Sequence, residues 1–383
     1  MSIRPARGTP SYIVGPVSRF DQKNEVFKRA RWDPSLKDES ERFYGIVYPR
    51  GKPGYQLKDL ALRDAAWYIE DAFGHGCRIH NLGLLSWEAL SKEQRCIPGD
   101  LRLDTTDNQA MSQDVKRVAM LFGASLVGIT KLNRLWIYSH TYDTSTHEHK
   151  EFELPDEYRY AIVLAFQMDY NLVRTSPTWL AQATEGVEYS RMPFTASMLA
   201  QFIRNLGYKA IPSANDTAIS IPLAIDAGLG ELGRNGLLIT KKFGPRVRIA
   251  KVFTDLPLEP DDPIDFGVIQ FCSICKKCAD NCPSQAIPSG ARSTKPHNIS
   301  NAENQLKWPV NAERCFSFWS KNEGSCMNCI RSCPFNKPHG RIHDLVRWLI
   351  KRISWLDSTF VMIDDLFEYD KQVLPDFWKN EEK

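Results

Sequence analysis

The stretch FCSICKKCADNCPSQA, residues 271–286, places four cysteines within eleven residues and follows the last of them with Pro283. Its cysteines read C-x2-C-x2-C-x3-C-P, and they are Cys272, Cys275, Cys278 and Cys282. A second set reads C-x10-C-x2-C-x3-C-P, and its members are Cys315, Cys326, Cys329 and Cys333. Eight of the ten cysteines in this 383-residue chain therefore fall in one segment, and only Cys77 and Cys96 stand apart.

Two ordinary explanations for so many cysteines fit poorly. Disulfide frameworks belong mostly to small secreted domains, whereas this chain is long and confines its cysteines to one segment. Structural zinc would need two separate tetrahedral sets, and zinc patterns rarely place three cysteines at successive two-residue gaps. The spacing instead predicts two 4Fe–4S clusters of the bacterial ferredoxin type, in which the fourth cysteine of a motif binds the other cluster.

We therefore expect crossed ligand sets, with three cysteines from one motif and the last cysteine of the other. The sets are Cys272, Cys275, Cys278 and Cys333 for one cluster, and Cys315, Cys326, Cys329 and Cys282 for the other. Each fourth cysteine is expected to begin a helix, because a proline is tolerated in the first helical turn. Residues 316–325, FSFWSKNEGS, are expected to form a polar, flexible loop that returns Cys315 to its cluster.

The composition is that of an ordinary globular protein. Hydrophobic residues make up 43% of the chain, charged residues 25%, and the formal net charge is +3. Because the charge is small and no run of five basic residues occurs, nucleic-acid binding has little support. No apolar run reaches the roughly 18 residues that span a bilayer, and the N-terminal residues contain neither an apolar signal core nor a twin-arginine pair.

More than two hundred residues precede the cysteine-rich segment, and they alternate between helical and extended patterns. Residues 113–133 begin as a helix and continue into an apolar strand, 157–168 predict a buried strand, and 177–208 predict a helix that ends near Gly207. A strand and loop over 209–216, a helix over 220–229 and strands over 235–240 and 247–255 follow. This alternation predicts an α/β (α+β) core.

The glycines in GLGELGRNG satisfy G-x-G-x-x-G at Gly228, Gly230 and Gly233, and Asp255 follows about twenty residues later. A dinucleotide site needs a strand before these glycines and a helix after them. Here the order is reversed, so the motif is interpreted as a decoy. Close approach of the backbone to another flat cofactor would explain the glycines equally well.

Longer segments carry a family resemblance. YSRMPFTASMLAQFIRNLGYKAIPSAND and the following AGLGELGRNGLLITKKFGPRVRIAKVFTDLPLEPDDPIDFGVIQFCSICKKCADNCPSQAI resemble the corrinoid-dependent reductive dehalogenases of the respiratory type, as do the later WPVNAERCFSFW and CPFNKP elements. The resemblance covers roughly residues 110–370 and is weak over the first hundred. It implies a nitroreductase-like core that binds a base-off cobamide (a corrinoid), while two 4Fe–4S clusters deliver electrons to its cobalt. The chain lacks the D-x-H-x-x-G signature, so no histidine lower ligand is expected.

The resemblance divides the chain into four parts. They are an N-terminal segment over 1–110 that helps to cover the pocket, the cobamide-binding core over 111–264, the two-cluster module over 265–340 and a C-terminal segment over 341–383 that packs on the core.

The resemblance also implies site residues. Tyr189 in VEYSRM would be the proton donor, Arg248 in FGPRVRIAKVFT its electrostatic partner, and Asn215 in IPSAND an amide that orients the halogenated carbon or holds the departing halide. Replacing C–halogen by C–H needs two electrons and one proton, and a phenol stays protonated at neutral pH. A neighbouring guanidinium is expected to lower the phenol pKa. Trp319, together with Trp32 and Trp67, would line the substrate pocket. Without the resemblance, each of the site residues named in this paragraph is equally well an ordinary core, strand or turn residue.

Two rival functions stay open from the sequence. An epoxyqueuosine reductase would share the cobamide and the paired clusters but would need a surface for tRNA. A non-catalytic iron–sulfur electron carrier would not need the large core.

The resemblance implies a small organohalide substrate and a low-potential electron donor, with a small membrane-anchor protein as an expected partner, and it allows a homodimer. It places the protein at the outer face of the cytoplasmic membrane if a twin-arginine leader has been removed, and otherwise in the cytoplasm.

Overall fold

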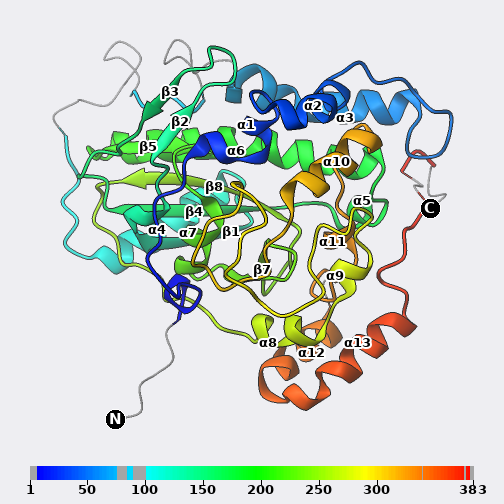
Figure 1. The fold of residues 1–383 in the computed structure, drawn as a ribbon. Helices are drawn as coiled ribbons and strands as arrows, with labels where there is room; N and C mark the ends of the chain where they lie inside the picture. Colours follow the sequence, from blue (N-terminus) through cyan, green and yellow to red (C-terminus); the bar gives the residue numbers. More distant parts are fainter. Residues whose placement is uncertain (1–6, 76–83, 89–100, 339, 375–376, 380–383) are drawn as a thin grey trace.

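The computed structural model describes residues 7–75, 84–88, 101–338, 340–374 and 377–379. At its centre lies a four-stranded sheet in the order β1-β4-β8-β5, in which every pair of neighbours is antiparallel. The strands are β1 (Leu126–Lys131), β4 (Tyr160–Gln167), β8 (Val247–Thr254) and β5 (Ala210–Ser213). Figure 1 shows the sheet beneath the long helix α6 (Trp179–Asn205).

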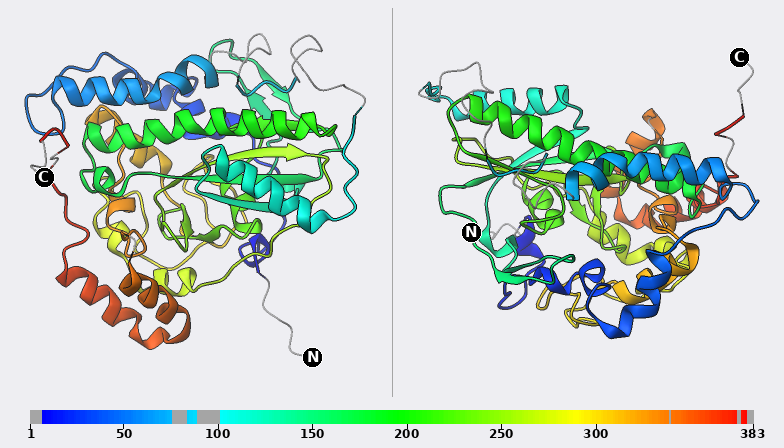
Figure 2. Two further views of the ribbon diagram at one scale, coloured as in Figure 1. Left: turned by 180° about the vertical axis from the view of Figure 1, so that it is seen from behind. Right: turned by 90° about the horizontal axis from the view of Figure 1, so that it is seen from above.

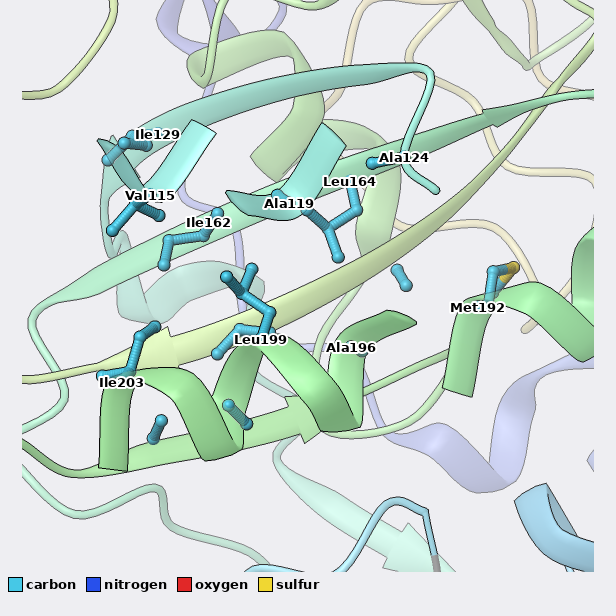
Figure 3. Packing of buried hydrophobic residues seen from close by; sticks show 14 of the residues in the cluster. Val115, Ala119, Ala124, Ile129, Ile162, Leu164, Met192, Ala196, Leu199 and Ile203 are labelled. Carbon is cyan, nitrogen blue, oxygen red and sulfur yellow. The ribbon is translucent and has the colours of Figure 1, made fainter. Parts of the chain in front are cut away.

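The sheet is buried on both faces, which explains why its central strands read as continuous apolar runs. On β4, Ile162, Leu164 and Phe166 pack with α6 and α4 (Asn108–Leu121), as Figure 3 shows for the first two. The alternate residues of β4 pack with α7 (Ser220–Asp226) on the other face. This two-sided packing follows from the alternation of side chains along a strand.

Two short hairpins flank the sheet, β2 (His140–Tyr142) with β3 (His149–Glu151), and β6 (Gly230–Leu232) with β7 (Leu238–Thr240). The N-terminal part contributes α1 (Val26–Arg29), α2 (Lys37–Phe43) and α3 (Leu57–Ile69), and α3 runs alongside α6 (Figures 1 and 2).

The cysteine-rich part contains α8 (Val268–Ile274), α9 (Lys277–Asp280), α10 (Ala312–Asn322) and α11 (Asn328–Arg331). Helix α5 (Tyr170–Arg174) precedes α6, and α12 (Arg341–Arg352) and α13 (Asp357–Leu366) close the chain. Single helical turns complete the set at Thr9–Ser11, Gln22–Asn24, Pro34–Leu36, Glu70–His75, Arg134–Trp136 and Ser354–Leu356.

The predicted mixed α/β class is confirmed, and the helices and strands expected between residues 113 and 255 are present at the expected places. The cysteine-rich part differs from prediction in two respects.

The first difference concerns residues 316–325, which we expected to form a flexible loop. Most of this segment continues helix α10, which begins when the Asn311 side chain accepts a hydrogen bond from the Arg314 amide. The helix ends where Glu323 and Gly324 adopt positive φ angles of 55° and 154°. Cys315 and Trp319 therefore lie four residues apart on one helix face, an i,i+4 spacing that the sequence already contained.

The second difference concerns the two Cys-Pro pairs, which were expected to begin helices. Instead, each pair opens a four-residue turn. The amide of Gln285 donates to the carbonyl of Cys282, and the amide of Asn336 donates to the carbonyl of Cys333. Proline occupies the second position of both turns, where its fixed φ is favourable. The two motifs thus end in the same local structure.

The G-x-G-x-x-G segment forms the start of the β6–β7 hairpin, after a helix and before strands, so its interpretation as a decoy agrees with the structure. A Cβ at Gly230 would lie 2.2 Å from the carbonyl oxygen of Ile239, and one at Gly228 would lie 2.5 Å from that of Asp262. These two glycines therefore allow the chain to approach its own backbone, and the flat-cofactor explanation is unnecessary for them.

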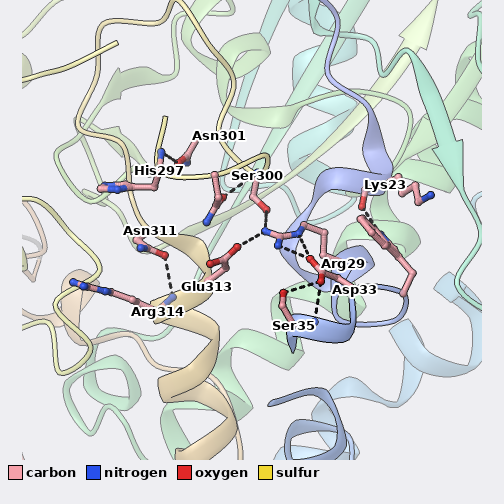
Figure 4. A network of polar contacts seen from close by, with 12 residues as sticks. Lys23, Arg29, Asp33, Ser35, His297, Ser300, Asn301, Asn311, Glu313 and Arg314 are labelled. Atoms are coloured by element: carbon pink, nitrogen blue, oxygen red, sulfur yellow. Dashed lines mark hydrogen bonds and ion pairs between the residues drawn. The ribbon is translucent and has the colours of Figure 1, made fainter. Parts of the chain in front are cut away.

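The N-terminal segment is fixed to α10 by a buried arginine. Arg29 at the end of α1 bonds to Asp33 at 2.5 Å and to Glu313 on α10 at 2.7 Å, and it also reaches Ser300 (Figure 4). Residues 29–33 are thus held against the cysteine-rich part. Among the described residues, no helix has the length and apolar character needed to cross a membrane.

Candidate active site

The three residues expected to act in catalysis come from separate elements and meet at one cavity. Tyr189 lies on α6, Asn215 in the loop after β5, and Arg248 near the start of β8. Arg248 lies on the same face of β8 as Ala250 and Val252, which pack against α6. All three line a cavity of about 850 Å³.

The Tyr189 side chain is oriented by an aromatic neighbour and an amide. The indole of Trp67 stacks on its ring with the centroids 4.7 Å apart and the planes at 24°. The side-chain N–H of Asn215 donates to the phenolic oxygen at 3.1 Å. Because Asn215 is the donor, the phenolic hydrogen stays available to a molecule in the cavity. The amide therefore contacts the acid itself, whereas we expected it to contact the substrate.

Arg248 is held by a carboxylate on α6. Its guanidinium lies 5.4 Å from the centre of the Tyr189 ring and bonds to Glu185 at 2.5 Å. Glu185 also accepts a hydrogen bond from the hydroxyl of Ser325. Although burial lowers the pKa of Arg248, the neighbouring Glu185 and Tyr189 hold that pKa above its usual value, so the side chain stays a cation.

The pKa of Tyr189 corrects one expectation. Burial raises this pKa above the usual value of 10, and the opposing influence of Arg248 and the hydrogen bond from Asn215 do not cancel that effect. The nearby Glu185 raises it further. Arg248 lowers this pKa as expected, but the net pKa is still raised, because desolvation of the phenolate exceeds the attraction of one partly neutralised cation.

Aromatic side chains form much of the cavity wall. Trp319 on α10 lies 5.6 Å from the ring of Phe27 and 6.3 Å from that of Phe43, and all three line the cavity together with Trp67. Trp32 is not among the described residues that line it. Its indole N–H donates to the carbonyl of Lys23, and the Lys23 ammonium lies 4.6 Å over the ring.

The structure brings the eight cysteines of the two motifs into two neighbouring groups. Burial raises the pKa of Cys272 to about 12, of Cys275 to about 11 and of Cys315 to about 12, and neighbouring thiols raise the pKa of Cys272 and Cys315 further. The thiols of Cys272 and Cys275 raise the pKa of Cys333. The thiol of Cys282 likewise raises the pKa of Cys315, Cys326 and Cys329. Each group thus contains the last cysteine of the other motif. Cys77 and Cys96 lie outside the described residues.

The second group of cysteines lies beside the large cavity. Cys282, Cys315, Cys326 and Cys329 line a smaller hollow of about 290 Å³. Arg248 and Trp319 line both this hollow and the large cavity. A cluster held by these cysteines would be separated from a molecule in the large cavity by little more than those side chains.

Sequence reasoning missed Glu185 and Gly186. Glu185 precedes Tyr189 by four residues and therefore shares its helix face, a signal that the spacing could have provided. Gly186 has a steric role, because a Cβ there would lie 2.5 Å from Cδ1 of Trp67. Its importance depends on α3 packing against α6, which no local pattern indicates.

Comparisons with known proteins cover both the cysteine-rich part and most of the remaining chain. Residues 271–337 match the 4Fe-4S dicluster domain. A tetrachloroethene reductive dehalogenase of Sulfurospirillum multivorans is 37% identical, with 97% of this chain and 83% of the relative covered. One from Desulfitobacterium hafniense is 38% identical, with 86% of this chain and 71% of the relative covered.

Among solved structures, a reductive dehalogenase described as suggesting a mechanism for B12-dependent dehalogenation superposes with a TM-score of 0.76 at 23% identity. The match covers 97% of this chain, which spans about half (49%) of that longer protein, so it establishes the fold alone. The identity to the two tetrachloroethene enzymes extends over most of both partners, and on that ground the chain belongs to the reductive dehalogenase family.

Proposed function

We propose that this protein replaces the halogen of a small organohalide by hydrogen at a cobamide, using electrons that arrive through two 4Fe–4S clusters. One observation carries the proposal: the hydroxyl of Tyr189 keeps its hydrogen available in a cavity that shares Arg248 and Trp319 with the hollow of the second cysteine group. A proton donor and an electron entry point therefore meet at one place, as the reaction requires.

The residues present fit the two kinds of cofactor. Two groups of four cysteines, the first buried and the second half-buried, supply the thiolates that 4Fe–4S clusters need. The large cavity continues into a further hollow of about 260 Å³, since both are lined by Phe20, Glu25 and Tyr138. Among the described residues, Nε of Arg248 and Nε1 of Trp319 are buried donors without a partner, as expected for groups that meet a bound molecule. Residues lining these joined hollows would hold the cobamide.

When bound, the cobamide supplies the two electrons that break the carbon–halogen bond. Tyr189 provides the proton, so that R–X, two electrons and one proton give R–H and halide. The phenolate that remains is stabilised by the charge of Arg248 and the N–H of Asn215. Reprotonation of Tyr189 from solvent completes the cycle.

The aromatic wall favours an apolar substrate. Trp319, Phe27 and Phe43 offer flat apolar surfaces, and the relatives from Sulfurospirillum multivorans and Desulfitobacterium hafniense are tetrachloroethene reductive dehalogenases. We therefore propose halogenated alkenes as the substrate class.

The decisive experiment supplies the purified holoenzyme with a low-potential donor and a panel of chlorinated and brominated alkenes, alkanes and phenols, and measures halide release. We expect release from alkenes, and we expect Tyr189→Phe to lower the rate by about 10²–10⁴-fold while cluster and corrinoid content stay unchanged. Tyr208→Phe is the matched control, because its hydroxyl bonds to the carbonyl of Leu103 away from the cavity. A normal rate in Tyr189→Phe would disprove the proton-donor role, and reduction of epoxyqueuosine in tRNA without halide release would favour the rival enzyme.

We also propose that the enzyme works at the outer face of the cytoplasmic membrane with a small membrane-anchor protein as partner. Fractionation of native cells tests this proposal, since a peripheral enzyme sediments with membranes and is released by mild detergent together with its anchor. Recovery only in the cytoplasmic fraction would contradict it.

A further inference from the structure

A second group of metal-binding side chains lies away from the cysteines, at the β2–β3 hairpin. Asp21, His140 and His149 each present one ligand atom, and these atoms lie within 4.8 Å of one another. Asp21 is more than a hundred residues from both histidines in the sequence, so their convergence results from the fold. None of the three lines the large cavity among its described residues.

The hairpin register places both imidazoles on one face. His140 pairs with Glu151 and Tyr142 pairs with His149, so the two histidines are diagonal neighbours across the strands. Their ring centroids are 4.8 Å apart with the planes inclined by 34°. Two protonated imidazoles at this distance would repel each other, whereas two neutral ones can share a cation.

Hydrogen bonds direct the ligand atoms toward a common point. Nδ1 of His140 lies 3.0 Å from the hydroxyl of Ser139, which leaves Nε2 free to coordinate. Nε2 of His149 lies 3.0 and 3.1 Å from the two oxygens of Asp21. Asp21 is itself oriented by the amide of Lys23, which donates to it at 2.9 Å. The contacts of Ser139 with His140 and of the Lys23 amide with Asp21 lie outside the ligand set, and outer contacts of this kind are the usual support of metal-binding histidines and carboxylates.

We propose that Asp21, His140 and His149 bind one divalent transition-metal ion, best matched by Zn²⁺, with water completing its coordination. Two imidazoles and one carboxylate suit zinc better than Ca²⁺ or Mg²⁺, which prefer all-oxygen sites.

The ion joins the hairpin to the wall of the active-site cavity. Asp21 lies between Phe20 and Gln22, and both of these residues line the large cavity. Gln22 already accepts a hydrogen bond from the amide of Tyr142 on β2 at 3.3 Å. The ion therefore adds a stronger connection between the same two segments and fixes the N-terminal side of the cavity.

Isothermal titration of the holoenzyme with ZnCl₂ tests the site. We expect one saturable binding event in the wild type, its loss in a His140→Ala/His149→Ala double variant, and its retention in His147→Ala. His147 is the matched control, because it lies in the same hairpin but contacts the hydroxyl of Tyr142. Iron and corrinoid content, measured on every variant, shows that the clusters and the core are intact.

Two further measurements separate a metal site from a simple ion pair. Ser139→Ala should weaken zinc binding by about 10–100-fold, as loss of an outer contact usually does. Zinc should also slow amide hydrogen exchange over residues 20–25 and 140–151 in the wild type but not in the double variant. Equal zinc binding by the wild type and the double variant, or no saturable binding at all, would overturn the proposal and leave His149 and Asp21 as an ordinary ion pair.

Discussion

Tyr189 is surrounded by groups that act on its pKa in opposite directions, and this allows a test at the scale of single residues. A phenol donates only while protonated, so activity falls as the pH rises through its pKa. Burial raises that pKa, which moves the loss of activity above pH 10. Replacing Glu185 by Gln removes a negative charge that raises the pKa, so the alkaline limb of the pH–rate profile should move to lower pH.

Asn215→Ala should move the same limb in the opposite direction. The amide of Asn215 stabilises the phenolate and lowers the pKa of Tyr189, so its removal raises that pKa further. Initial rates after brief exposure to each pH provide the measurement. If both variants shift the limb to the same side, the titrating group is not Tyr189.

Gly186 makes room for the indole that stacks on Tyr189. In Gly186→Ala the new Cβ would come within 2.5 Å of Trp67, so the ring must move and the stack on Tyr189 is lost. We expect a loss of about 1–3 kcal/mol in the free energy of unfolding and a reduced rate of halide release. Gly290→Ala is the control, because a Cβ there meets nothing within 4 Å. Equal effects of the two substitutions would contradict this role.

The sequence predicted the catalytic residues only through family motifs. Tyr189 and Arg248 look like core residues locally, and their proximity depends on the pairing of β8 with β4 and the packing of α6 on the sheet. The pKa of Tyr189 could not be predicted, since it reflects a balance between burial and charges from other elements. Trp32 was assigned where the resemblance was weak, and it bonds within the N-terminal segment.

Among the elements, the N-terminal segment depends on Arg29 for its attachment to α10. Arg29→Ala leaves Asp33 and Glu313 without their shared cation, and we expect the free energy of unfolding to fall by less than the about 3–5 kcal/mol typical of a fully buried pair, because the Glu313 side chain is 36% exposed. We expect residues 20–47 to become susceptible to proteolysis while α6 stays protected. Limited proteolysis followed by mass spectrometry provides the measurement.

Arg117→Ala is the matched control for that experiment. Arg117 pairs with Asp114 on the exposed side of α4, where ion pairs contribute about 0–1 kcal/mol. A proteolytic pattern in Arg29→Ala that equals that of this control would show that the segment is held by other contacts.

Long periodic elements were predictable and local details of the cysteine motifs were not. The helix over 177–208 and the strand over 157–168 have strong apolar patterns. Residues 316–325 contain serine, lysine, asparagine and glycine, which favour a loop by composition, yet the helix that the Asn311 cap begins continues to Asn322.

For the molecule as a whole, the crossed ligand sets make a prediction about its two clusters. Cys282→Ala should change the reduced EPR spectrum in the same way as Cys315→Ala, although Cys282 belongs to the first motif. Cys333→Ala should resemble Cys275→Ala for the same reason. Spectra that pair by motif, with Cys282→Ala resembling Cys275→Ala, would contradict the crossed arrangement.

The number of clusters and their crossed ligands could be predicted from spacing, but not which cluster faces the substrate. Which cluster lies beside the cavity depends on α10. This helix places Cys315 and Trp319 on one face and so brings the second group of cysteines to the cavity. The hairpin site of Asp21, His140 and His149 likewise has no signature in the sequence, because its members are brought together only by the fold.

The origin of the cavity wall has a consequence for how such enzymes diversify. Tyr189 and its charged neighbours Glu185 and Arg248 are held by α6 and β8, whereas Phe27 and Phe43 come from a separate segment fastened mainly to α10. Mutations in that segment can reshape the chamber without disturbing proton delivery. Substrate preference can therefore drift in evolution while the chemistry is inherited unchanged, and exchange of residues 20–47 between relatives should transfer preference from one to another.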